Sequence, residues 1–240
     1  CGLMKTRITL SQLEISCLIG VLDPERIQPQ PLLVDMTLEL DSKKAALSEK
    51  LEHTWDYDRL TEQILFILQT GHFYLLESAA HVLARWVLIP PIPGEKRPQI
   101  DRVQIRLTKP AALPGSAQAV VEVEASAADQ HYEQEDKTWG SVDIVEETRR
   151  MGLYRLTILP NTELPEHHHM KMREAELVLH QGLEGTQDSQ PYAPLQIGQV
   201  FLWQKAQLHS YRNVGQQPAS LLCMDSPPFD PLDEILSEAS

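Results

Sequence analysis

The sequence predicts an α+β unit, in which an antiparallel sheet carries two helices on one face, followed by an all-β barrel. Strand-like alternation and two amphipathic segments occupy the first 125 of the 240 residues, and short strand-like runs separated by turns occupy the rest. The charge is also uneven, because residues 1–125 carry 13 Lys and Arg against 16 Asp and Glu, whereas residues 126–240 carry 8 against 18. We therefore expect domains at 1–125 and 139–240, joined by an exposed linker at 126–138.

Alternation of apolar and polar residues predicts four strands in the first domain, and 3.6-residue periodicity predicts two helices. Asp56 is placed to cap the first helix and Gly71 to end it. Two helices on one face leave the edges and the other face of the sheet open, which favours a homo-oligomer. In chain order, we expect strands at 8–15 and 34–40, helices at 57–68 and 75–88, and strands at 103–107 and 121–123.

Four short motifs stand at characteristic separations in the first domain. They are residues 20–26 (GVLDPER), 56–57 (DY), 75–77 (LLE) and 109–110 (KP). In this order they resemble the dihydroneopterin aldolase family of folate biosynthesis, over residues 8–124. The resemblance implies the tunnelling fold, a pterin substrate, and homo-oligomeric rings with active sites between subunits. One departure is Ser48-Glu49-Lys50, where many relatives carry a pair of aspartates.

The same resemblance implies a lyase reaction without a cofactor, in which dihydroneopterin is cleaved to 6-hydroxymethyl-7,8-dihydropterin and glycolaldehyde. The pterin ring takes up the electrons, so the protein has to hold the ring and move protons. A carboxylate can accept two parallel hydrogen bonds from the ring's amino group and adjacent N–H. By resemblance, the catalytic residues are Lys109, Tyr57 (from the neighbouring subunit) and Glu25, and the substrate-binding residues are Glu77, Leu76 and Gln30.

The second domain contains a motif that resembles the first cupin motif, with Asn161 in place of its glycine. Asparagine tolerates a left-handed backbone better than most residues, so the replacement is mild. His167 and His169 point to the same face of a strand, as two ligands of one ion must. The next ligand is a glutamate; the spacing favours Glu174 and leaves Glu176 open.

The second cupin motif runs from Gly198 to Asn213 and places His209 at the expected position. Gln204 and Ala206 replace the motif's proline and glycine, so the turn is expected to differ in shape. Three imidazoles and a carboxylate suit a divalent metal such as Mn, Fe, Ni or Zn. The predicted metal ligands are His167, His169, Glu174 and His209.

The leading interpretation is a dihydroneopterin aldolase with an appended metal-binding cupin whose substrate the sequence does not identify. One alternative is the dihydroneopterin triphosphate 2'-epimerase, which shares the fold and the bond cleavage. The near-neutral first domain gives no sign of a triphosphate pocket and favours the aldolase. Another alternative treats the pterin fold as a scaffold for a cupin-type metal enzyme or sensor.

Composition restricts the partners and the compartment. The net charge of −13 disfavours nucleic acid and anionic membranes as partners. No apolar run is long enough to span a bilayer, and no secretory signal pattern is visible. Cys1, Cys17 and Cys223 are sparse and without paired spacing, which favours a reducing compartment. We therefore expect a cytoplasmic protein.

Overall fold

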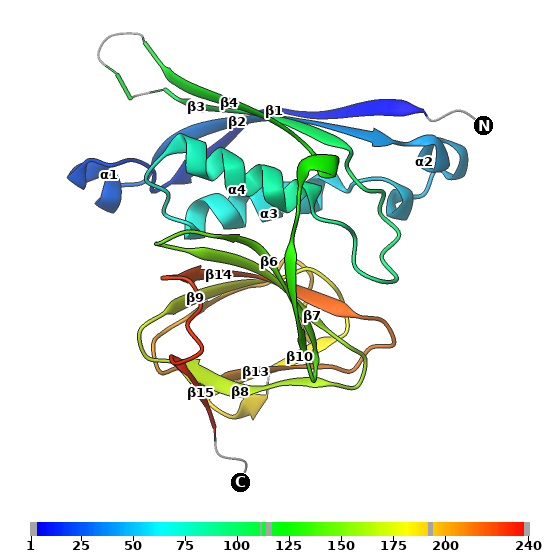
Figure 1. The fold of residues 1–240 in the computed structure, drawn as a ribbon, viewed down its shortest axis with the longest axis vertical. Helices are drawn as coiled ribbons and strands as arrows, with labels where there is room; N and C mark the ends of the chain where they lie inside the picture. The colour runs from blue at the N-terminus through cyan, green and yellow to red at the C-terminus, as the bar shows by residue number, and fades with distance from the viewer. Residues whose placement is uncertain (1–3, 111, 114–116, 192–193, 238–240) are drawn as a thin grey trace. The chain divides into compact units, whose positions relative to one another are not determined.

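Figure 1 shows the computed structural model, which describes residues 4–110, 112–113, 117–191 and 194–237. The chain divides into two compact units, one formed by residues 1–91 and 95–131 and the other by residues 92–94 and 132–240. The predicted linker is shorter in the structure, because β5 (Glu133–Lys137) pairs with β6 (Gly140–Glu147) as an edge strand of the second unit. All β5 side chains are exposed and none is apolar, which explains why the sequence shows no apolar periodicity there.

The described residues of the first unit form a four-stranded antiparallel sheet in the order β1-β2-β3-β4, with α3 and α4 packed on one face (Figure 1). This is the predicted α+β fold. Four short elements, α1, α2, η1 and η2, were not predicted. The bounds are β1 (Lys5–Cys17), α1 (Asp23–Ile27), β2 (Gln30–Asp41), α2 (Lys43–Ser48), η1 (Leu51–His53), α3 (Tyr57–Thr70), α4 (Leu76–Leu88), β3 (Arg102–Lys109), β4 (Ala119–Ser126) and η2 (Ala127–Asp129).

The core of this unit lies between the sheet and the two helices. Inward residues of β2 such as Val34 and Met36 are fully buried, and so are Leu60 of α3 and Leu83 of α4. Asp56 caps α3 as predicted, since its carboxylate accepts hydrogen bonds from the backbone N–H groups of the next turn at 3.0 and 3.3 Å. Burial of this apolar layer stabilises the sheet and fixes the ends of β3 and α4.

The described residues of the second unit form two antiparallel sheets. Their orders are β11-β10-β13-β8-β15 and β12-β9-β14-β7-β6-β5. Apolar side chains from both sheets share one buried cluster, among them Leu183 and Tyr211 from one sheet and Leu156 and Leu221 from the other. This confirms the predicted all-β unit, although the described residues form two sheets around a common core and not the predicted closed barrel.

The remaining bounds in this unit are β7 (Gly152–Ile158), β8 (Glu163–His169), β9 (Arg173–Val178), β10 (Leu183–Gln187), β11 (Gln190–Pro191), β12 (Val200–Trp203), β13 (His209–Asn213), β14 (Ala219–Ser226) and β15 (Glu234–Leu236). Across the part of the chain described here, no helix combines the length and the apolar character needed to cross a bilayer.

Two turns of the second unit show how the motif substitutions are accommodated. Asn161 adopts a φ of 61° and Ala206 a φ of 63°, both in the left-handed region. Asn161 therefore takes the conformation expected of the glycine that it replaces. Ala206 does the same, although its Cβ makes the left-handed backbone unfavourable. The change of shape expected from the loss of the glycine is therefore not seen at Ala206.

Candidate functional sites

A buried ion pair joins the end of β3 to α1. Lys109 is 7% exposed, and its Nζ donates hydrogen bonds to Glu25 Oε1 and, at 3.1 Å, to the carbonyl of Ile19. The other oxygen of Glu25 accepts from the N–H of Leu22 at 2.9 Å. The hydrogen bond from Lys109 lowers the pKa of Glu25 below its ordinary value. The pair therefore holds a positive and a negative group together in a largely enclosed position.

Gln30 and Arg26 complete this cluster. Gln30 Nε2 donates to the same Ile19 carbonyl at 2.5 Å. The guanidinium of Arg26 donates to the carbonyls of Gly20 and Phe73 at 3.1 and 2.9 Å, and Gly20 N–H also donates to Phe73 at 3.1 Å. These bonds fasten the loop before α4 to the segment that carries Glu25. The sequence reasoning assigned no role to Arg26, although it lies within the first motif.

The other predicted pterin-site residues lie at the starts of the two long helices. Leu76 is buried and Glu77 is exposed in the first turn of α4, which begins three residues after Phe73. Tyr57 begins α3, is 56% exposed, and its hydroxyl has no hydrogen-bond partner among the described residues. The structure thus brings Lys109, Glu25 and Gln30 together, places Glu77 beyond the loop tied to them, and leaves Tyr57 open to solvent.

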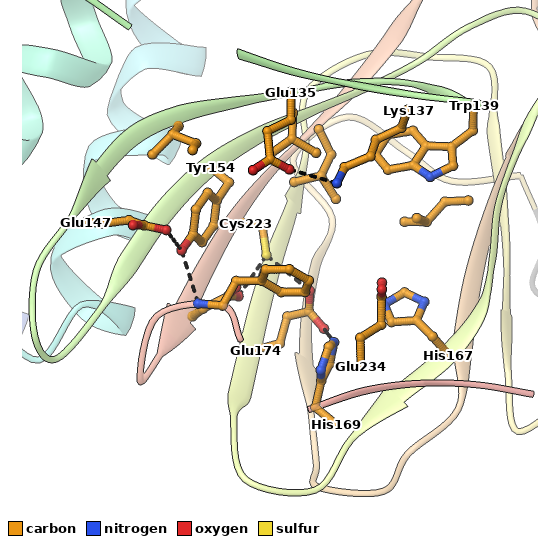
Figure 2. Close-up of a pocket in the computed structure, with 16 residues that line it drawn as sticks. Glu135, Lys137, Trp139, Glu147, Tyr154, His167, His169, Glu174, Cys223 and Glu234 are labelled. Carbon is orange, nitrogen blue, oxygen red and sulfur yellow. Dashed lines mark hydrogen bonds and ion pairs between the residues drawn. The ribbon is translucent and has the colours of Figure 1, made fainter. Parts of the chain in front are cut away.

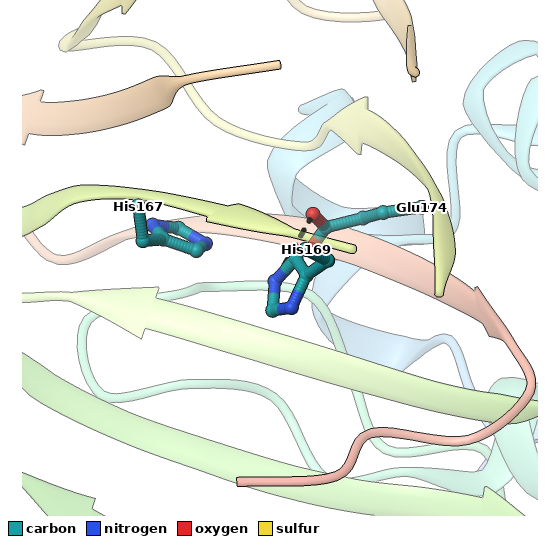
Figure 3. A group of neighbouring side chains, drawn as sticks. All are labelled: His167, His169 and Glu174. Atoms are coloured by element: carbon teal, nitrogen blue, oxygen red, sulfur yellow. Dashed lines mark ion pairs between the residues drawn. The ribbon is translucent and has the colours of Figure 1, made fainter. Parts of the chain in front are cut away.

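The predicted metal ligands converge inside the second unit. His167 and His169 come from β8, Glu174 from β9 and His209 from β13, and all four are buried. Ligand atoms of His167, His169 and Glu174 lie within 4.8 Å of one another (Figure 3). Glu174 Oε2 lies 2.9 Å from His209 Nε2 and 3.8 Å from His169 Nε2. Cys223 Sγ donates to the other oxygen of Glu174 at 3.1 Å.

Each imidazole is oriented by a backbone carbonyl. The Nδ1 atoms of His167, His169 and His209 lie 2.8, 3.2 and 3.1 Å from the carbonyls of Pro165, Asp233 and Gln207. A carbonyl can only accept, so each Nδ1 carries the proton. This leaves each Nε2 as the atom that can bind a metal, which is the outer-shell arrangement typical of metal-binding histidines. The donor set therefore fits a divalent metal ion.

The charges in this cluster are strongly coupled. Burial lowers the pKa of the His209 imidazole, but the neighbouring Glu174 carboxylate outweighs it and raises that pKa to about 9. Burial and the charge on His209 lower the pKa of His167 to about 4. Burial raises the pKa of Glu174, but the adjacent imidazoles bring it to about 2. Near neutral pH, His209 is a cation paired with Glu174, and His167 is neutral.

Glu176 lies beside the same cluster. It is fully buried, and its Oε2 accepts hydrogen bonds from Trp203 Nε1 at 2.5 Å and from the Tyr211 hydroxyl. Its Oε1 has no hydrogen-bond partner among the described residues, and Glu176 forms a second possible ligand group with Glu174 and His209. Glu174 belongs to these two groups and to a third with Cys223 and Asp225, and it pairs with two imidazoles, which favours it over Glu176.

A cavity of about 140 Å³ reaches the metal cluster (Figure 2). His167, His169 and Glu174 line one part of it, and apolar side chains such as Trp139 and Phe229 line another. A small molecule in this cavity would therefore contact the ligand side chains directly.

The first unit matches the family model described as dihydroneopterin aldolase over residues 8–125. The dihydroneopterin aldolase of Escherichia coli is 28% identical over 117 residues, which are 49% of this chain and 90% of the relative. That of Haemophilus influenzae is 27% identical over 107 residues, 45% of this chain and 85% of the relative.

Two solved structures are similar to separate parts of the chain. The E. coli aldolase in complex with neopterin is 26% identical with a TM-score of 0.45, covering 50% of this chain and 99% of that one. A Klebsiella pneumoniae protein with a double-stranded β-helix domain is 20% identical with a TM-score of 0.36, covering 40% of this chain and 83% of that one. The family match shows that residues 8–125 form a domain of the dihydroneopterin aldolase family.

Proposed function

We propose that the first unit is an active dihydroneopterin aldolase. The observation that carries the proposal is the buried Lys109 ammonium, which Glu25 and the Ile19 carbonyl hold at the end of β3 within a domain of this family. An ammonium in such a position can exchange protons with a bound substrate. Glu25 keeps that group in place.

In this proposal the protein binds the substrate through its ring and cleaves a bond in its side chain. Glu77 accepts hydrogen bonds from the pterin amino group and the adjacent N–H, and Leu76 contacts the ring. Tyr57 relays the proton of the side-chain hydroxyl to solvent, that oxygen becomes the carbonyl of glycolaldehyde, and the carbon–carbon bond breaks. The ring receives the electron pair, and a proton delivered through Lys109 gives 6-hydroxymethyl-7,8-dihydropterin.

Replacing the lysine tests this function. Lys109→Ala is expected to abolish release of glycolaldehyde while neopterin binding, measured by calorimetry, persists. Lys96→Ala serves as the control, because Lys96 is an exposed lysine of the same unit paired with Glu52. Unchanged turnover in Lys109→Ala would refute the assignment. A wild-type enzyme that yields an isomerised substrate without glycolaldehyde would identify an epimerase.

We also infer that the active site is shared between copies of the chain. The support is the exposure of Tyr57 and Glu77 together with the open edges of the four-stranded sheet. Inactive Lys109→Ala and Tyr57→Phe variants, when unfolded and refolded together, are expected to regain activity, because some sites then combine an intact lysine with an intact tyrosine. No recovery in a mixed oligomer would contradict the sharing.

For the second unit we propose a divalent-metal site formed by His167, His169, Glu174 and His209. The three oriented imidazoles support it. His167→Ala is expected to abolish binding of Zn²⁺ or Mn²⁺ in a titration, whereas His168→Ala is expected to retain it. His168 is the matched control because adjacent side chains on β8 point to opposite faces. Equal binding by both variants would contradict the ligand set. Both variants are expected to cleave the pterin at the wild-type rate, which would show that the second unit acts independently of the aldolase reaction.

A further inference from the structure

The C-terminal segment of the second unit returns to the strand that carries two of the metal ligands. β15 pairs with β8, so that Glu234 lies opposite His169 and Leu236 opposite His167. Immediately before β15 stands Asp233, which is only 3% exposed. A charged side chain is rarely buried to this degree unless several polar groups compensate it.

The compensation comes from the turn that links β8 to β9. Asp233 Oδ1 accepts hydrogen bonds from the N–H groups of Met170 at 3.2 Å and Lys171 at 3.0 Å. Its Oδ2 accepts from Lys171 at 3.0 Å and Met172 at 2.9 Å. Three consecutive backbone donors thus converge on one carboxylate. This turn sets the separation of His169 from Glu174, because it connects the strands that carry them.

Asp233 has a second contact with the site. Its backbone carbonyl lies 3.2 Å from His169 Nδ1 and orients that imidazole so that Nε2 is the atom left for a ligand. Hydrogen bonds to a carboxylate are roughly twice as strong as those between neutral groups. Without that carboxylate, the three N–H groups of the turn lose their acceptor, and both the turn and the carbonyl are free to shift.

We propose that Asp233 is a positioning residue of the metal site, which clamps the β8–β9 turn through its carboxylate and orients His169 through its carbonyl. The inference rests on the proposed metal binding. Outer-shell partners of metal-binding histidines typically change metal affinity by about 10–100-fold when they are replaced. We therefore expect a loss within that range when the Asp233 carboxylate is removed.

The test is a competition titration of Zn²⁺ with the full chain, together with the absorption spectrum of the Co²⁺-loaded protein. Asp233→Ala is expected to bind Zn²⁺ at least about tenfold more weakly and to shift the Co²⁺ bands, because His169 changes its orientation. Asp233→Asn keeps one acceptor oxygen and is expected to fall between that variant and the wild type. Asp230→Ala is the control, since Asp230 lies on the same segment and, among the residues that the structure describes, its carboxylate accepts a hydrogen bond only from the exposed Leu232 N–H.

The outcomes separate the two proposals. A wild-type protein that binds no metal would overturn the metal site and the role of Asp233 with it. If both Asp233 variants bind Zn²⁺ as tightly as the wild type and show the same Co²⁺ bands, the positioning role is overturned while the metal site stands. Should Asp233→Ala fail to fold, Asp233→Asn carries the test. A lower melting temperature of the metal-free variant with unchanged affinity would show that Asp233 only stabilises the fold.

Discussion

Metal binding to the second unit is expected to release about one proton from His209. In the metal-free cluster, His209 Nδ1 faces the Gln207 carbonyl, and Nε2 lies 2.9 Å from Glu174 Oε2, whose charge raises the pKa of the imidazole to about 9. Near neutral pH both nitrogens therefore carry protons. A metal can bind Nε2 only after its proton has left. The carboxylate that holds this proton is itself one of the predicted ligands, so the ion has to replace an existing ion pair.

The size of the effect follows from the pKa of about 9 for His209. At pH 7 the imidazolium outnumbers the neutral form by roughly 100 to 1, and neutralising it costs roughly 3 kcal/mol. Between pH 6 and 8 the apparent metal affinity is therefore expected to rise about tenfold per pH unit. His167 adds nothing to this slope, because its pKa of about 4 keeps it neutral throughout the range.

The assay is calorimetric titration of Zn²⁺ at pH 7 in buffers with different ionisation enthalpies, where the dependence of the heat on the buffer gives the number of protons released. Glu174→Gln is the comparison, because it removes the charge that raises the pKa of His209 and should lower the proton release. Histidine resonances of the metal-free protein provide an independent pKa. Metal binding without proton release, or a His209 that is neutral at pH 7, would refute the reasoning.

Three further predictions concern single side chains. Glu77→Ala is expected to weaken neopterin binding by roughly 1–3 kcal/mol, because the ring N–H groups lose their acceptor, and normal calorimetric affinity would count against its role. Glu174→Gln should reduce Zn²⁺ affinity more than Glu176→Gln in parallel titrations; the reverse order would identify Glu176 as the ligand. Asp143→Ala should lower the free energy of unfolding in urea by about 1–3 kcal/mol, because it removes the carboxylate that accepts a hydrogen bond from the buried Arg155 Nε at 2.8 Å. No measurable change would show that the pair contributes little.

Strong periodicity made the first unit predictable. The alternation in β2 corresponds to side chains such as Val34 and Met36 that are fully buried, and Asp56 marked the start of α3 correctly. The helices α1 and α2 were missed because they contain five and six residues and bury none of them, so they leave no periodic signal. β5 was missed for the same reason, since an exposed edge strand needs only backbone pairing.

The metal ligands could be predicted from the spacing of residues in the sequence, because histidine and glutamate are distinctive ligand types. The contribution of Asp233 could not, because its partners are backbone N–H groups 61 to 63 positions away in the chain. Every residue type except proline presents such a donor, so no sequence motif marks the contact. The same holds for Arg26, whose partners at Gly20 and Phe73 are carbonyls. Such contacts emerge only when the fold brings the segments together.

The left-handed Ala206 has a consequence for the durability of the second unit. Its N–H donates to the carbonyl of His169 at 2.7 Å, so the turn between β12 and β13 is fastened to the end of β8. For a residue with a Cβ, this backbone conformation costs roughly 1–2 kcal/mol. Glycine would adopt this backbone conformation without that penalty and would keep the same N–H. Because glycine also raises the conformational entropy of the unfolded chain, part of the stabilisation is lost. Heat tolerance can therefore be raised at this turn while every side chain around the imidazoles stays as it is.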